Sequence, residues 1–98
     1  MSIEYGLILE KARWFAKSGG VGCAEELLHR LNRLNGLDNA TYSGILSHAY
    51  AQKALKFDRY AKSLENRKPS LANILRIKAE SYRAIARDYQ YLAQDPSA

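Results

Sequence analysis

The chain has little of several features that each mark a special class of protein. Its single cysteine, Cys23, excludes a disulfide within the chain and fits a reducing cytoplasm. Two prolines and six glycines exclude collagen-like and low-complexity sequences. No apolar run approaches the ~20 residues of a membrane span, and the start lacks the basic and then apolar pattern of a secretory signal. We therefore expect a cytoplasmic protein that does not enter the membrane.

The residues that are present have an ordinary globular composition with a basic balance. Of the 98 residues, 47% are hydrophobic and 26% are charged, which argues against disorder and predicts a single domain over 1–98. Fifteen lysines and arginines against ten acids give a net charge of +5, and most of the excess follows residue 37. This balance favours an acidic partner, either nucleic acid or the acidic face of another protein.

Hydrophobic periodicity predicts an all-α fold of four helices. The run Gly19-Gly20-Val21-Gly22 and the later Gly36 are typical helix stops, and Asp38 or Asn39 is placed to cap the third helix. We expect two short N-terminal helices to pack on a long antiparallel hairpin made by the other two. The predicted helices cover about residues 2–17, 23–35, 40–66 and 70–93.

Two heptad stripes predict the seam of the hairpin. They consist of Leu46, Tyr50, Lys53, Phe57, Tyr60 and Leu64, and of Leu71, Leu75, Lys78, Tyr82, Ile85, Tyr89 and Leu92. A turn near residues 65–70 sets residues opposite each other where their numbers sum to about 135, so Tyr60 faces Leu75. Each helix then has one seam lysine beside a ring. The lysine stems cover these rings, or they line an anion pocket.

The first helix is predicted to have a broad apolar face, with Lys11, Arg13 and Lys17 elsewhere on its surface. Ile3, Leu7 and Trp14 lie near one line, and Ile8, Ala12 and Phe15 lie beside it.

Catalytic chemistry is poorly supported, and we expect neither an enzyme nor a metal or cofactor. His29 and His48 fall on different helices and lack metal-ligand spacing. Cys23 lies near a helix start, where a thiol is activated, but a small core residue is the simpler interpretation. The run Gly19-Gly20-Val21-Gly22 precedes a helix as phosphate loops do. However, no strand precedes it and no Gly-Lys-Ser/Thr follows, which favours a plain turn.

The basic and aromatic residues of the hairpin give the strongest functional signal. Arginine and tyrosine are frequent in protein interfaces, so we expect a docking face for an acidic partner, the alternative being a solvated helix face. Direct binding to nucleic acid is expected to be weak or absent, because no zinc, zipper or RNA-binding pattern is present. The predicted partner-binding residues are Lys56, Arg59, Lys62, Arg76, Arg83, Arg87 and Tyr91.

In its size, its basic all-helical chain and its proline between two helices, Lys68-Pro69-Ser70, the chain resembles the anti-RecBCD accessory proteins of lambdoid, Salmonella-type phages. The resemblance implies binding to the RecBCD helicase–nuclease through its RecC subunit in the host cytoplasm. This binding would inhibit or redirect a host defence enzyme and favour phage recombination. The resemblance also implies that Pro69, in the exposed loop formed by Arg67, Lys68, Pro69 and Ser70, is presented to a host prolyl isomerase.

Two other functions remain open. One is an oligomeric anti-defence protein that sequesters an anionic cyclic nucleotide through Lys17, the glycine run 19–22 and the seam lysines Lys53 and Lys78. The other is weak, nonspecific nucleic-acid binding by the basic face. Without the resemblance, Pro69 is most simply a residue that begins a helix.

Overall fold

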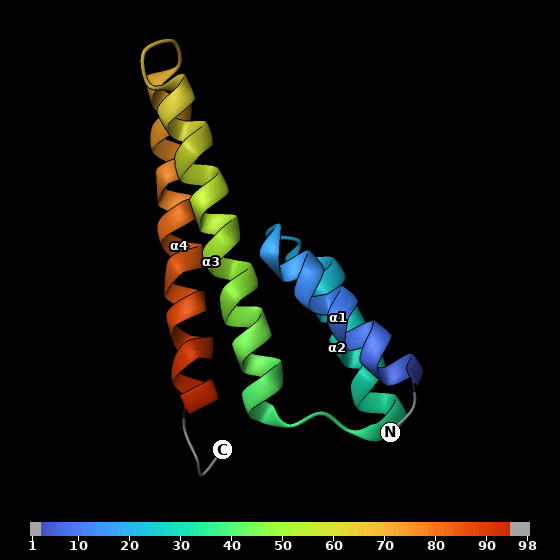
Figure 1. Ribbon diagram of the computed structural model, residues 1–98. Coiled ribbons are helices and arrows are strands. Elements are labelled where there is room, and N and C mark those ends of the chain that lie inside the picture. Colours follow the sequence, from blue (N-terminus) through green and yellow to red (C-terminus); the bar gives the residue numbers. More distant parts are fainter. Residues whose placement is uncertain (1–2, 95–98) are drawn as a thin grey trace.

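The computed structural model describes residues 3–94 and consists of four α-helices, which confirms the all-α prediction (Figure 1). The observed helix ends lie within two residues of the predicted ones, although the predicted start at residue 2 falls outside the described residues. None of the helices in this range combines the length and hydropathy needed to span a membrane. The helices are α1 (Ile3–Lys17), α2 (Val21–Asn35), α3 (Asn39–Leu64) and α4 (Pro69–Gln94).

The helices form two antiparallel pairs of unequal length (Figure 1). α3 and α4 make the long hairpin, and α1 and α2 make a shorter pair that packs against the first half of α3. Residues Ile45, Leu46 and Ala49 of α3 join the buried residues of the shorter pair in one core cluster. The half of the hairpin nearest the α3–α4 loop, which we call the distal half, is therefore left uncovered by α1 and α2 (Figure 1).

Alanines form the seam between α3 and α4. Heptad spacing keeps one line of side chains facing the partner helix, and small side chains let the two backbones approach closely. The prediction that large residues fill this seam is wrong at four positions, because Tyr60, Leu71 and Leu92 are 55%, 37% and 41% exposed and Lys78 lies on the surface. The buried seam alanines are Ala54 and Ala61 on α3 and Ala72, Ala79 and Ala86 on α4.

The register of the hairpin agrees with the sequence prediction. The Ser47 hydroxyl donates to the Ala86 carbonyl at 2.8 Å, and Lys53 Nζ lies 4.8 Å from the ring centre of Tyr82. The residue numbers of these partners sum to 133 and 135. The predicted covering of a ring by Lys53 is thus present, and its ammonium group makes a cation–π contact there. Phe57 stacks on the same Tyr82 ring.

A chain of six rings, the aromatic ladder, runs from α2 along one flank of the hairpin. Neighbouring ring centres lie 5.3–6.4 Å apart, in the range of favourable stacked and edge contacts. Partial burial raises the pKa of the Tyr42 and Tyr50 hydroxyls, and the neighbouring Tyr89 and Glu25 add to the effect. Tyr42 is half-buried against the core. In order, the ladder is His29, Tyr42, Tyr89, Tyr50, Tyr82 and Phe57.

Two predicted helix signals in the connection from α2 to α3 are confirmed. Gly36 ends α2 with φ of 73°, a backbone conformation that favours glycine. Asp38 caps α3, accepting hydrogen bonds from the Thr41 amide at 3.0 Å and from the Thr41 hydroxyl at 2.8 Å. These contacts fix where α3 begins.

Removal of the Asp38 carboxylate is expected to lower the melting temperature near neutral pH. The side-chain and then the backbone hydrogen bond from Thr41 lower the pKa of Asp38. The stabilisation is therefore present above the unfolded pKa and is lost as the pH falls through the lower folded pKa. Thermal melts of Asp38→Ala should differ most from wild type near neutral pH and least in strong acid. Asp38→Asn keeps a capping oxygen and is the control; identical neutral-pH melts for Asp38→Ala and wild type would contradict the capping role.

Candidate docking surface

Cations dominate the distal half of the hairpin. Between Gln52 and Arg76 the sequence has only two carboxylates, Asp58 and Glu65. Both are held by arginines of α4: Asp58 pairs with Arg83, and Glu65 pairs with Arg76 at 2.6 Å. The acids of this region are thus engaged along the flank where α3 meets α4.

Two of the predicted partner-binding arginines therefore have a structural role within the hairpin. Arg76 joins Glu65, and Arg83 joins both Asp58 and Glu80, with 2.6 Å to the latter. All these side chains are more than a third exposed, so each pair contributes only about 0–1 kcal/mol. Their use by a partner remains a prediction, and a partner would compete with these ion pairs.

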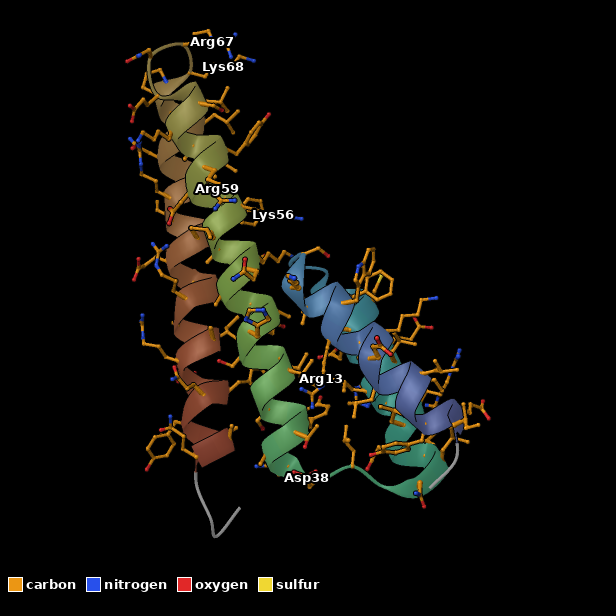
Figure 2. All side chains as sticks on the ribbon, viewed as in Figure 1. Arg13, Asp38, Lys56, Arg59, Arg67 and Lys68 are labelled. Carbon is orange, nitrogen blue, oxygen red and sulfur yellow. The ribbon has the colours of Figure 1, made fainter. Side chains whose placement is uncertain are left out.

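The remaining cations of the distal half form a strip along α3 and the loop. Lys56, Arg59 and Lys62 follow at steps of three residues, so their side chains lie within one sector of the helix surface. Figure 2 shows Lys56 and Arg59 along α3, with Arg67 and Lys68 at the loop. Within residues 3–94, none of these cations has an ion pair. The basic strip comprises Lys56, Arg59, Lys62, Arg67 and Lys68, all exposed.

Apolar side chains lie exposed on the same half of the hairpin. Leu55 is 40% exposed within the sector of the strip, and Tyr60 is 55% exposed beside it. On α4, Ile74 and Ile77 are 51% and 68% exposed. Sequence reasoning missed Leu55, although its position four residues before Arg59, on the same helix face, was a usable signal. Exposed apolar residues rimmed by charge are typical of protein interaction sites.

Pro69 begins α4 and is exposed next to the strip. Its peptide bond is trans, and a first-turn proline leaves no helical hydrogen bond unmade. The amides of Arg67 and Lys68 donate to the Leu64 carbonyl at 3.0 and 2.7 Å, which makes the loop a compact turn. Ser70 follows in the first turn of α4 and is also exposed.

The other predicted contact residues are not brought to this strip. Arg87 and Tyr91 lie in the C-terminal part of α4, whose end is at the opposite end of the hairpin from the loop (Figure 1). Tyr91 is 72% exposed. The predicted docking face is thus divided among the strip, the ion-paired arginines and a separate C-terminal patch.

The presence of glycine in the turn between α1 and α2 has a steric explanation that does not require a bound anion. Gly19 has φ of 78°, and a Cβ there would lie 3.1 Å from the Lys53 amide nitrogen and 3.2 Å from its Cα. The turn therefore packs directly on the backbone of α3, which glycine alone permits without strain. Of the seam lysines proposed for the same anion site, Lys53 covers Tyr82 and Lys78 lies on the surface.

The remaining candidates for chemistry are dispersed. Cys23 is exposed, so its interpretation as a core residue is wrong. His29 packs edge-on against Tyr42. Across the described range, no group of three or more His, Cys, Asp or Glu side chains is arranged to hold a metal ion.

Comparisons with protein families, with curated proteins and with solved structures find no match for this chain.

Proposed function

We propose that this protein is an interaction protein that binds the acidic face of a protein partner through the basic strip. The observation that carries this proposal is the distal half of the hairpin, where α1 and α2 leave the strip uncovered and its cations unpaired among residues 3–94 (Figure 2). Cations that have no internal partner are available to pair with carboxylates of another molecule.

A protein partner fits the strip better than a nucleic acid does. Leu55 and Tyr60 put apolar surface among the cations, and such side chains are buried by a protein surface rather than by phosphates. Arginine and tyrosine are also the residues that most often dominate protein interfaces. The net charge of +5 is modest for a protein held by phosphate contacts alone.

The resemblance to phage accessory proteins makes a bacterial DNA-processing enzyme the first partner to test. Under this proposal, the protein inhibits or redirects RecBCD, with RecC as its contact, in the host cytoplasm. The exposed Pro69 beside the strip is the proposed site for a host prolyl isomerase.

Removal of the three α3 cations of the strip is expected to weaken partner capture at least tenfold while the fold is kept. The triple variant Lys56→Ala, Arg59→Ala, Lys62→Ala removes exposed side chains, so its stability should change by less than about 0.5 kcal/mol per site. Interface arginines contribute ~2 kcal/mol or more each, so capture should fall at least tenfold. The measurement is affinity capture from nuclease-treated bacterial lysate, followed by binding to purified RecBCD.

The matched control removes the same charge elsewhere. Lys11, Arg30 and Arg33 are exposed on α1 and α2, and their triple alanine variant should capture the partner normally. Equal loss in both triple variants would show that net charge, not the strip, drives capture. Failure of the wild-type protein to retain a large partner would refute the proposal, and capture that disappears only after nuclease treatment would assign the strip to nucleic acid.

A further inference from the structure

A groove separates the C-terminal half of α1 from the first half of α3. Its volume is about 400 Å³, within the range of small-molecule sites. Arg13 and Lys17 of α1 line one side, and His48 of α3 lines it from the other helix. Figure 2 shows Arg13 between the two helices, well away from the loop end of the hairpin.

The charged and ionisable side chains that line this groove are all basic. Arg13 and Lys17 are four residues apart, so they lie on the same face of α1, one turn from each other. No carboxylate lines the groove, and none forms an ion pair with either cation in the described part of the chain. The nearby carboxylate of Asp38 is held by Thr41. Two adjacent cations without a counter-charge repel each other, and a bound anion relieves that repulsion.

The groove also has an apolar floor and free space above it. Ile45 is 7% exposed and Ala16 is 1% exposed, so both present little more than a small hydrophobic base. Gly44 of α3 has no side chain, and a Cβ placed there would meet nothing within 4 Å. A larger residue at this position would project into the opening, so glycine leaves room for a ligand over the α3 backbone.

We propose that this groove binds a small phosphorylated molecule that carries a planar or apolar group. The guanidinium of Arg13 suits a phosphate because its parallel N–H groups match two phosphate oxygens, and Lys17 adds a second positive charge. The imidazole of His48 and the side chain of Ile45 then border the uncharged part of the ligand. This site goes beyond the docking function, because it uses other residues and a different class of ligand.

The proposal is tested by titrating the ¹⁵N-labelled protein with adenosine monophosphate, adenosine and inorganic phosphate. Adenosine monophosphate should shift the amide signals of Gly44, Ile45 and His48 in a saturable way, and adenosine should bind at least tenfold more weakly. Weaker saturable binding of inorganic phosphate at the same amides would assign the phosphate subsite to Arg13 and Lys17. The double variant Arg13→Ala, Lys17→Ala should weaken adenosine monophosphate binding at least tenfold.

Two further variants separate a built site from general charge attraction. Lys56→Ala, Arg59→Ala removes the same charge from the basic strip and should leave adenosine monophosphate binding unchanged. Gly44→Leu keeps both cations and replaces glycine within a helix, so the protein should fold normally and yet lose the ligand. Shifts that do not saturate, equal binding of adenosine, equal loss in the strip variant, or full binding by Gly44→Leu would each overturn the site.

Discussion

Replacing Ala61 by leucine is expected to destabilise the protein by ~2–3 kcal/mol, because an overpacked core forces side chains and backbone to move. Ala61 is fully buried and belongs to the cluster of Leu64, Ala72 and Leu75 at the distal end of the hairpin. Leucine adds three carbons at a point where two backbones approach closely. Since small domains are stabilised by only about 5–15 kcal/mol, denaturant titration followed by circular dichroism should detect the loss easily.

The control for this variant lies on the same helix. Ala51 is exposed on α3, so Ala51→Leu should change the free energy of unfolding by less than about 0.5 kcal/mol. If Ala61→Leu unfolds at the same denaturant concentration as Ala51→Leu, the close alanine seam is wrong. The same result would favour a seam made of the larger heptad residues.

The hairpin shows which features heptad spacing predicts and which it leaves open. Step lengths of three and four residues correctly gave two long helices, their antiparallel pairing and the contact of Lys53 with Tyr82. They did not show which line of residues faces the partner helix, because alanines recur with the same period as the tyrosines. Burial of Ala54 and Ala79 moves the larger rings to the flank. The heptad recurrence of alanine was visible in the sequence and could have shown this.

In α1, the prediction that Ile3, Leu7 and Trp14 belong to the apolar face that packs on the core is wrong, because all three are exposed. Apolar residues surround much of the helix, so its own pattern does not select a face. The structure buries Ala12 and Ala16, whose small side chains fit against α2 and α3, and leaves Leu7 and Trp14 more than 60% exposed. Only the position of the neighbouring helices distinguishes these two faces.

The candidate sites were predictable to different degrees. Exposed cations at Lys56 and Arg59 follow from their helix positions alone. The pairing of Arg83 with Asp58 joins two residues 25 positions apart in sequence, so it depends on how α3 and α4 are aligned along each other. The groove at Arg13 and His48 depends on how the shorter helix pair is placed on α3, which no local pattern encodes.

Because the shorter helix pair packs on α3 in this way, Gly19 is the glycine at which a side chain would be hardest to accommodate. Its positive φ costs a residue with a side chain about 1–3 kcal/mol. The Cβ contacts of 3.1 and 3.2 Å would fall on the backbone of Lys53, which cannot rotate away as a side chain can. The shorter helix pair must therefore shift away from α3 if any side chain is introduced at position 19.

Gly19→Ala is accordingly expected to destabilise the protein by ~2–4 kcal/mol, combining the strained φ with the cost of overpacking. Gly22→Ala is the matched control: Gly22 lies inside α2 with nothing within 4 Å of its Cβ position, so alanine should stabilise the helix by about 0.5–1 kcal/mol. Denaturant titrations of both variants should therefore move in opposite directions. Equal stability of Gly19→Ala and wild type would mean that the turn does not rest on α3. In that case the glycine run would again be open to a binding role.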